Sequence, residues 1–417
     1  MKLGFLWWPA GIVVAVSALA CQRELVAPGT CPEMCPGGSP RVVDTVLTPV
    51  MDMDSTYPGY IQPGQGVALL VSEGLPVFNS RAVIKFLPVN DSLLVNDTLR
   101  TFQVDSMGFR IGLAARDVAA TNLQILLYRI PSDVDSSVTF ADIEPFLTDS
   151  TFIGSIAVDD TTFTDVFRLI VSDSATLDLL SLTPADSGVM AIAVAMSASQ
   201  PSGISIGSVS AGGAGPLWQT FVTIDSVADT TLQQQTITRI TQFNTFVSEN
   251  PAPIDFNVLT VGGAPSARSL IRFDLTSRLG SRDSSQIVRA TLKLIPVAPI
   301  PGIPNDSATV RVRGVQTDIG AKSPLCGFNP GALCGSWVVS TVIDALLVPG
   351  SSDTISIEVS DLVRGWQGQL GSARSLFLQL NPEASTFTQP EFGSSRTPGF
   401  TSFIELTYVL PFPFGER

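Results

Sequence analysis

The side chains of this chain that could do chemistry are carboxylates. Its 417 residues include no histidine, which excludes a Ser-His-Asp or Cys-His arrangement and any histidine metal ligand. Two nearby carboxylates could still serve a glycoside hydrolase or a polysaccharide lyase. Close aspartate pairs lie in turns between apolar runs, where aspartate is also common because it caps backbone N–H groups: Asp52 with Asp54, Asp133 with Asp135, and Asp159 with Asp160. We therefore expect turn residues here, and predict no catalytic residue and no enzymatic activity.

The same carboxylates could bind calcium, because loops of extracellular β proteins often gather aspartate and backbone oxygens. No spacing in the sequence fits a known calcium loop. We predict no cofactor and no metal site, with calcium kept as the alternative.

Tryptophans offer a second kind of chemistry, since an indole can stack against the C–H face of a sugar ring. The candidates are Trp218, Trp337 and Trp366. Trp366 follows Leu362 and Val363 at a spacing that favours burial. Trp337 lies close to a cysteine, in a stretch where we expect exposure.

The five cysteines separate into one lone residue and two close pairs. Cys31 with Cys35 and Cys326 with Cys334 predict two local disulfides in an exported protein. The alternative is a metal site, which is disfavoured because the pairs lie far apart in the sequence and no histidine can complete a usual ligand set.

The lone cysteine, Cys21, ends an apolar run that begins at Leu3 and closes with Ser17-Ala18-Leu19-Ala20. Such a run followed by small residues is typical of a cleaved signal peptide, and the alternative is an uncleaved membrane span. The segment resembles the lipobox of bacterial lipoproteins, which implies removal of residues 1–20 and acylation of Cys21. Gln22 after the cysteine resembles an outer-membrane address, so we expect an exported chain anchored by lipid at the outer membrane or cell surface.

Charge narrows the choice of partners. The formal net charge is -13 with 24 Lys and Arg, and no segment gathers basic residues, so we expect no nucleic-acid partner. Residues 21–40 are rich in Pro and Gly without a period, which is typical of a tether.

The elements that must position these side chains are strands. Beyond residue 40, short runs alternate apolar and polar residues and end at Gly, Pro, Asn, Asp or Ser, as in Asp353–Val359. No window of similar length keeps a helical period, although a short helix is expected after Ser360 or Asp361. The sequence predicts an all-β fold.

The chain also repeats itself at an interval of about 185 residues. The matching pairs of segments, in chain order, are 43–47 with 228–232, 81–86 with 268–273, 171–173 with 359–361, and 221–224 with 403–406. We therefore predict two tandem domains, residues 41–225 and 226–412, each large enough for one β-sandwich.

The second copy carries the segments Ser266–Leu275, Ala290–Leu294, Ile357–Trp366, Ser375–Leu380, Phe392–Arg396 and Phe403–Tyr408. This order resembles the DNRLRE-type domains, which are related to disaggregatase-type carbohydrate-binding modules. The resemblance implies jelly-roll-like sandwiches of two antiparallel sheets. The first copy is similar but lacks a tryptophan after Ser172-Asp173, and the signature that names the family is not present as such.

Two functions from different classes follow. The first is a non-catalytic envelope lipoprotein that binds a glycan or a partner protein, or that acts as a structural surface module. The alternative is an acid-only polysaccharide lyase or glycoside hydrolase. The expected partners are the membrane, through the lipid anchor, and a polysaccharide or an envelope protein.

Overall fold

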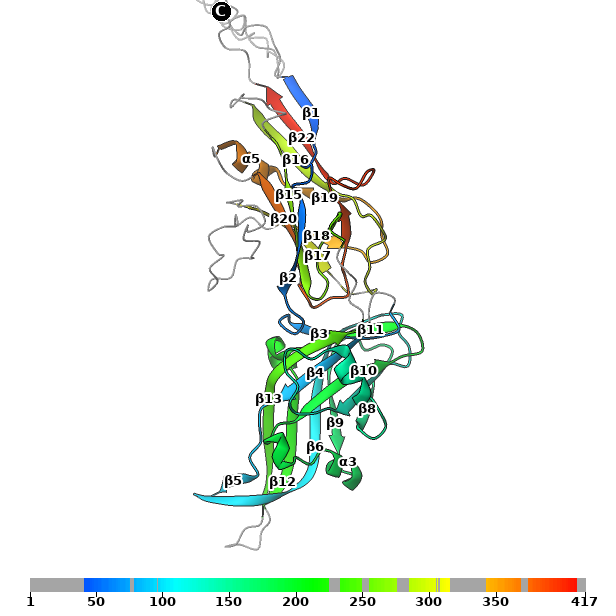
Figure 1. Cartoon of the computed structure of the whole chain (residues 1–417), viewed down its shortest axis with the longest axis vertical. Helices are drawn as coiled ribbons and strands as arrows, with labels where there is room; N and C mark the ends of the chain where they lie inside the picture. Colours follow the sequence, from blue (N-terminus) through cyan, green and yellow to red (C-terminus); the bar gives the residue numbers. More distant parts are fainter. Residues whose placement is uncertain are drawn as a thin grey trace, which may run out of the picture.

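The computed structural model describes residues 41–75, 79–95, 97–224, 233–249, 255–275, 285–304, 306, 308–315, 343–368 and 374–410. Strands make up 53% of the structure and helices 10%, which confirms the predicted all-β class. Two lobes follow one another along the long axis of the molecule (Figure 1).

The lobe in which the described chain both begins and ends is a sandwich of two antiparallel sheets. Its four-stranded sheet has the order β1 (Arg41–Leu47), β22 (Phe403–Leu410), β16 (Gln286–Leu294), β19 (Ile355–Glu358). Its five-stranded sheet has the order β18 (Ile343–Leu347), β17 (Ala308–Gly314), β20 (Ser375–Asn381), β15 (Ser266–Arg272), β2 (Ser55–Ile61). The short pair β14 (Val258–Thr260) and β21 (Glu391–Gly393) and the helix α5 (Ser360–Gly368) complete this terminal lobe.

The central lobe is one antiparallel sheet of eleven strands. Nine of them have the order β13 (Gln233–Ser248), β12 (Leu217–Ile224), β6 (Thr98–Arg116), β11 (Ser202–Gly207), β3 (Ala68–Glu73), β4 (Ser80–Phe86), β10 (Ala191–Ser197), β7 (Gln124–Arg129), β8 (Phe152–Ala157). The other two, β5 (Ser92–Val95) and β9 (Asp165–Val171), pair with β6. The helical segments are α2 (Phe140–Ile143), η1 (Glu144–Phe146), α3 (Ser174–Leu179), η2 (Pro184–Asp186) and η3 (Val209–Ala214).

The two lobes share one strand order. In the central lobe, the first half of β13 pairs with β12, then β6 and β9, as β1 pairs with β22, then β16 and β19. The second half of β13 pairs with β4, then β10, β7 and β8, as β2 pairs with β15, then β20, β17 and β18. The helices α3 and α5 follow β9 and β19 in the same way. The repeat read in the sequence is thus also a repeat of topology.

The first strands of the two copies are exchanged, which corrects the predicted domain boundaries of 41–225 and 226–412. β1 and β2 open the chain but belong to the terminal lobe, with Val43 opposite Tyr408 and Leu47 opposite Ile404. β13 opens the second copy but belongs to the central lobe. The central lobe therefore spans 68–248 and is inserted between β2 and β14. Apolar and polar residues alternate in the same way in the first strands of both repeats. The pattern therefore does not show which lobe each of these strands joins.

The exchanged strands also explain why one lobe is a sandwich and the other a closed sheet. β13 runs on without a break, pairing with β12 up to Ile240 and with β4 from Thr241, where the register shifts at a bulge. A bulge bends a strand and increases its twist, so one strand can cross from one layer to the next. In the terminal lobe the same two positions are filled by separate strands, because residues 48–54 interrupt β1 and β2. In the central lobe β13 thus joins two layers that stay separate in the terminal lobe, and the sheet closes on itself.

Two side chains from segments of the terminal lobe are part of the core of the central lobe. Ile303 and Phe387, from the second half of the chain, pack among the buried side chains of the central lobe, and Phe387 lies against Gly203 of β11. A Cβ added at Gly203 would lie 2.8 Å from the Phe387 ring, so a side chain there would displace the ring. Asp306 is buried beside this contact and accepts a hydrogen bond from the Phe387 backbone N–H at 2.7 Å.

Burial raises the pKa of Asp306 to about 6, against the pull of the Phe387 hydrogen bond, which lowers it. The folded chain therefore favours the protonated carboxyl. The stability that this preference contributes is present below about pH 4 and is lost as the pH rises through about 6.

We expect a chain of residues 62–249, which contains β3 through β13, to fold alone and to unfold in one thermal transition followed by circular dichroism. The chain 41–225, of similar length, lacks β13 with its buried Ile237, Phe246 and Val247, and we expect it to unfold at a lower temperature. Equal stability of the two fragments would show that β1 and β2 can replace β13, and would contradict the assignment.

We also expect Asp306→Asn to flatten the pH dependence of stability. Relative to the parent chain, the variant should gain up to about 3 kcal/mol in free energy of unfolding between about pH 4 and pH 7, because the amide stays neutral. Urea unfolding at several pH values measures this. Asp353→Asn, at an exposed carboxylate, is the control, and an equal change in both variants would refute the role of burial.

Candidate functional site

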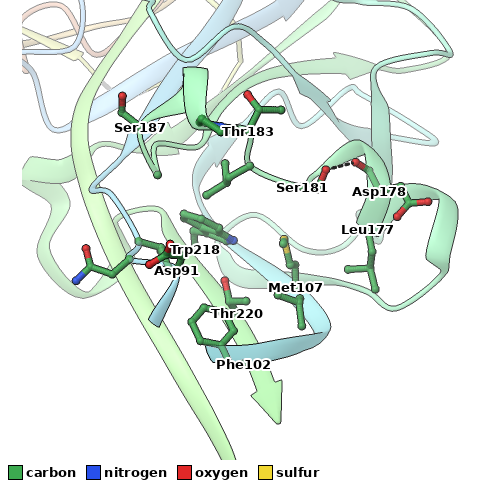
Figure 2. A pocket seen from close by; sticks show the side chains of 16 residues that line it. Asp91, Phe102, Met107, Leu177, Asp178, Ser181, Thr183, Ser187, Trp218 and Thr220 are labelled. Carbon is green, nitrogen blue, oxygen red and sulfur yellow. Dashed lines mark hydrogen bonds between the residues drawn. The ribbon is translucent and has the colours of Figure 1, made fainter. Parts of the chain in front are cut away.

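A pocket of about 740 Å³ opens in the central lobe, between β6, β12 and the segment that contains α3 and η2. Its size lies within the range of about 300–1,000 Å³ that small-molecule sites occupy. The side chains around it are shown in Figure 2. The lining residues are Val89, Asn90, Asp91, Phe102, Val104, Met107, Leu177, Asp178, Ser181, Leu182, Thr183, Pro184, Ser187, Gly188, Trp218 and Thr220.

The floor of the pocket comes from the inward face of β12 and β6. Exposure alternates along β12, so that Trp218 and Thr220 both face inward and are 1% and 2% exposed. Across the ladder Trp218 lies opposite Phe109 and Thr220 opposite Met107 of β6. Trp218 also contacts Phe86, with ring centroids 6.2 Å apart. The floor is therefore part of the core.

The walls are apolar and only partly buried. Phe102 and Val104 continue the inward row of β6, Leu177 comes from α3, and Leu182 follows that helix. All four also pack against buried clusters of the central lobe. The walls therefore offer a ligand an apolar surface.

The rim is fixed by backbone capping. The Asp173 carboxylate accepts the Thr176 N–H at 2.8 Å at the start of α3, and Asp186 accepts the Thr183 N–H and hydroxyl at 2.8 and 2.7 Å in η2. Burial acts to raise the pKa of Asp186, but these hydrogen bonds and the nearby Arg129, 3.2 Å away, outweigh it and lower the pKa. Asp186 is thus an ionised anchor of the rim.

Gly188 holds the opposite side of the rim. Its φ of +77° lies in the left-handed region, and a Cβ at this position would lie 2.4 Å from the Val89 carbonyl oxygen. The Val89 N–H donates to the Gly188 carbonyl at 2.8 Å. The chain around Val89, Asn90 and Asp91 is therefore clamped to the segment after η2.

Two buried polar atoms of the floor have no hydrogen-bond partner among the described residues, Trp218 Nε1 and Thr220 Oγ1. A buried donor or hydroxyl left unpaired costs about 1–3 kcal/mol. Seven other side-chain atoms of the described residues are also buried and unpaired, but their residues do not line the pocket. Both side chains border the same cavity. Both atoms are themselves buried, so a ligand oxygen would reach them only after a small movement of these side chains towards the cavity. After that movement the arrangement can bind a polar atom of a molecule whose remaining surface is apolar.

The charges around the pocket are negative. Asp91 and Asp178 lie on different sides of it in Figure 2, both exposed, while none of the lining residues is Lys or Arg. The Ser181 hydroxyl donates to the Asp178 carbonyl at 2.7 Å. An anion would therefore meet carboxylates at the mouth and no cation inside.

The predicted stacking residues have different positions. Trp218, one of the predicted residues, lies in the pocket floor. Thr220 and Met107 also line the pocket but were not predicted from the sequence. Trp366 is 5% exposed and stacks on Phe273 with ring centroids 6.2 Å apart, so it is a core residue of the terminal lobe and not a ligand platform. Trp337 lies outside the described residues.

All five cysteines, Cys21, Cys31, Cys35, Cys326 and Cys334, also lie outside the described residues. The lipid attachment at Cys21 and the two disulfides stay predictions.

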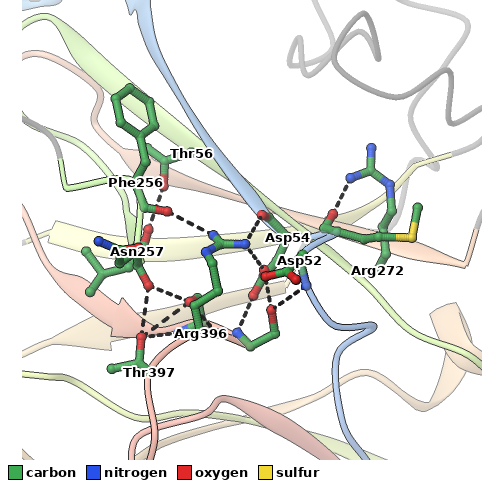
Figure 3. A network of polar contacts seen from close by, with 12 residues as sticks. Asp52, Asp54, Thr56, Phe256, Asn257, Arg272, Arg396 and Thr397 are labelled. Carbon is green, nitrogen blue, oxygen red and sulfur yellow. Dashed lines mark hydrogen bonds and ion pairs between the residues drawn. The ribbon is translucent and has the colours of Figure 1, made fainter.

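The acidic pair Asp52 and Asp54 belongs to a structural network of the terminal lobe (Figure 3). Asp54 is buried and accepts the Ser395 N–H at 2.5 Å, the Ser395 hydroxyl at 2.7 Å and Arg396 Nη1 at 2.8 Å. Arg396 also donates to the Phe256 carbonyl at 2.9 Å. The carboxylate thus ties the segment before β2 to the chain between β21 and β22, and Arg396 extends the network to the chain before β14.

The other two pairs form turns, as expected. Asp135 accepts the N–H and hydroxyl of Ser137 at 2.8 and 2.6 Å, and Asp159 accepts the N–H of Thr161 at 2.8 Å together with its hydroxyl. These bonds lower the pKa of both carboxylates, the hydroxyl bond having the largest effect. Neither Asp135 nor Asp159 lines the pocket.

Within the described residues, carboxylate side chains do not gather in threes around a point that could hold a metal ion. Within the same residues, no helix has the length and apolar character needed to cross a membrane.

Comparisons with known proteins add little to this geometry. No protein family matches the sequence, and no curated protein does. Among solved structures, one titled as the structure of the Macrobrachium rosenbergii nodavirus aligns over 92% of this chain and 94% of that chain, with 8% identity. Its TM-score of 0.14 carries no argument about fold or function.

We expect Thr220→Val to stabilise the ligand-free chain by about 1 kcal/mol, because the change replaces an unpaired buried hydroxyl with a methyl group of the same shape. Urea unfolding of the parent and the variant measures the difference. Thr260→Val, at another buried threonine whose hydroxyl lacks a partner within the described residues, is the matched control outside the pocket and should behave alike. A large loss of stability in Thr220→Val alone would mean that the hydroxyl has a partner in the ligand-free protein.

Proposed function

We propose that this chain is a non-catalytic binding protein of the bacterial cell envelope, anchored through an acylated Cys21, which takes up a ligand in the pocket of its central lobe. The observation that carries the proposal is the pair of unpartnered buried atoms, Trp218 Nε1 and Thr220 Oγ1, on the floor of a 740 Å³ cavity.

A binding role is favoured because the pocket combines a floor built into the core with polar groups on its floor and rim. Ligand sites are typically apolar cavities in which a few polar atoms fix the orientation of the ligand. The two polar atoms of the floor stay unpaired among the described residues, although unpaired groups reduce stability. A ligand that pairs with them would remove that penalty.

The glycan form of this proposal receives less support than the small-ligand form. A sugar exposes hydroxyls around its ring and needs several polar partners. The walls formed by Phe102, Val104, Leu177 and Leu182 offer none, and the Ser181 and Thr183 hydroxyls of the lining already donate hydrogen bonds within the protein. Trp218 is 1% exposed, so its ring face is covered by core residues. The resemblance to carbohydrate-binding modules therefore stays a prediction about fold.

The alternative of an acid-only hydrolase or lyase has no specific support from the geometry. Asp54, Asp135 and Asp159 use their carboxylates to bind backbone and hydroxyl groups near them. A general acid or base must reach the proton that it transfers. Carboxylates engaged in turns outside the pocket are poor candidates for that task.

The chain from Gln22 to Arg417, which keeps every described residue, should bind the uncharged apolar dye N-phenylnaphthylamine with a saturable rise in fluorescence. Leu177→Trp should weaken binding by about tenfold or more, because an indole on α3 would fill the pocket. Leu179→Trp, on the same helix but not in the pocket lining, is the matched control and should bind as the parent does.

Two results would contradict the proposal. One is dye binding that both variants retain, which would place the apolar site elsewhere. The other is release of reducing ends or unsaturated products from uronate-rich polymers, which would make the chain an enzyme.

A further inference from the structure

We propose that the ligand of this pocket is an uncharged, mainly apolar molecule that carries a hydroxyl or carbonyl oxygen at its buried end. The inference rests on the proposed function and specifies the class of ligand. It depends on the chemistry of the two unpartnered floor atoms, the charge of the rim and the character of the walls.

The floor atoms require an oxygen. Trp218 Nε1–H is a donor only, so it can be satisfied by an acceptor such as a hydroxyl or carbonyl oxygen and not by an ammonium group. Thr220 Oγ1 can donate or accept, so it tolerates either kind of oxygen. The two residues occupy alternate positions of β12, about 7 Å apart along the strand, so both can face one ligand.

The charges exclude an anionic head group. A fatty carboxylate or a phosphate would be buried without a cation, because none of the described residues that line the pocket is Lys or Arg. Burying an ionised group without a partner is strongly unfavourable. The exposed Asp91 and Asp178 at the mouth add repulsion that salt would partly screen.

The walls require an apolar body. Phe102, Val104, Leu177 and Leu182 are all partly exposed to the cavity and carry no polar side-chain atom. Covering such surface stabilises a complex by about 25 cal/mol per Å² of apolar area before the entropy of binding is subtracted. A small polar solute would gain none of this.

The matched series of decanol, decanoate and decylamine tests the inference by displacement of N-phenylnaphthylamine from the Gln22–Arg417 chain. The three compounds share one apolar body and differ in the head group. We expect decanol to displace the dye at the lowest concentration, and decanoate and decylammonium to need at least about tenfold more, because each must bury a charge.

Two variants test the floor atoms. Trp218→Phe keeps an aromatic ring but removes the N–H, and Thr220→Val keeps the shape but removes the hydroxyl. Each should weaken decanol binding by about three- to tenfold, the effect of one lost hydrogen bond. Trp366→Phe and Thr260→Val make the same changes in the terminal lobe and should leave decanol binding unaltered. Competition curves are corrected for the dye affinity of each variant.

The outcomes separate the two proposals. If Leu177→Trp blocks the dye but decanoate or decylammonium competes as well as decanol, the pocket binds ligands and the assigned class is wrong. The same conclusion follows if neither floor variant changes decanol binding. If the dye does not bind the parent chain in the pocket, the proposed function itself fails.

Discussion

The structure depends on the antiparallel pairing that joins the first strands of each repeat to the other repeat. β1 matches β22 over seven residue pairs, and β13 matches β12 over eight. Main-chain hydrogen bonds of this kind satisfy buried backbone groups that would otherwise be left unpaired. Because each repeat supplies strands to the other, neither lobe is complete without both copies of the sequence.

The strand exchange also determines which strands surround the floor of the pocket. Trp218 and Thr220 are held facing inward because β12 pairs with β13 along one edge and with β6 along the other. An edge strand would expose its free N–H and C=O groups and would be open to pairing with other chains. The continuous β13 therefore both closes the central lobe and stabilises the strand that forms the floor of the site.

Much of this architecture could be predicted from the sequence. The rest depends on contacts between distant segments, which a local pattern does not determine. Alternation along segments such as Asp353–Val359 determined the fold class, and the match between 171–173 and 359–361 marked two equivalent strand ends, each followed by a short helix. The domain boundaries were wrong because strand pattern carries no information about a distant partner. Trp218 was a candidate, but Thr220 was missed. Alternation places both residues on one face of the strand, but only the packing of β6 and of the segment around α3 and η2 shows that this face borders a cavity.

The pairing of β1 with β22 has a mechanical consequence if Cys21 is acylated. Both strands lie along the long axis of the molecule at the end opposite the central lobe (Figure 1). A pull between the lipid anchor and a ligand held near Trp218 would load the ladder lengthwise, so that its hydrogen bonds would be strained together rather than opened one by one. The joint between anchor and pocket is thus arranged to withstand shear.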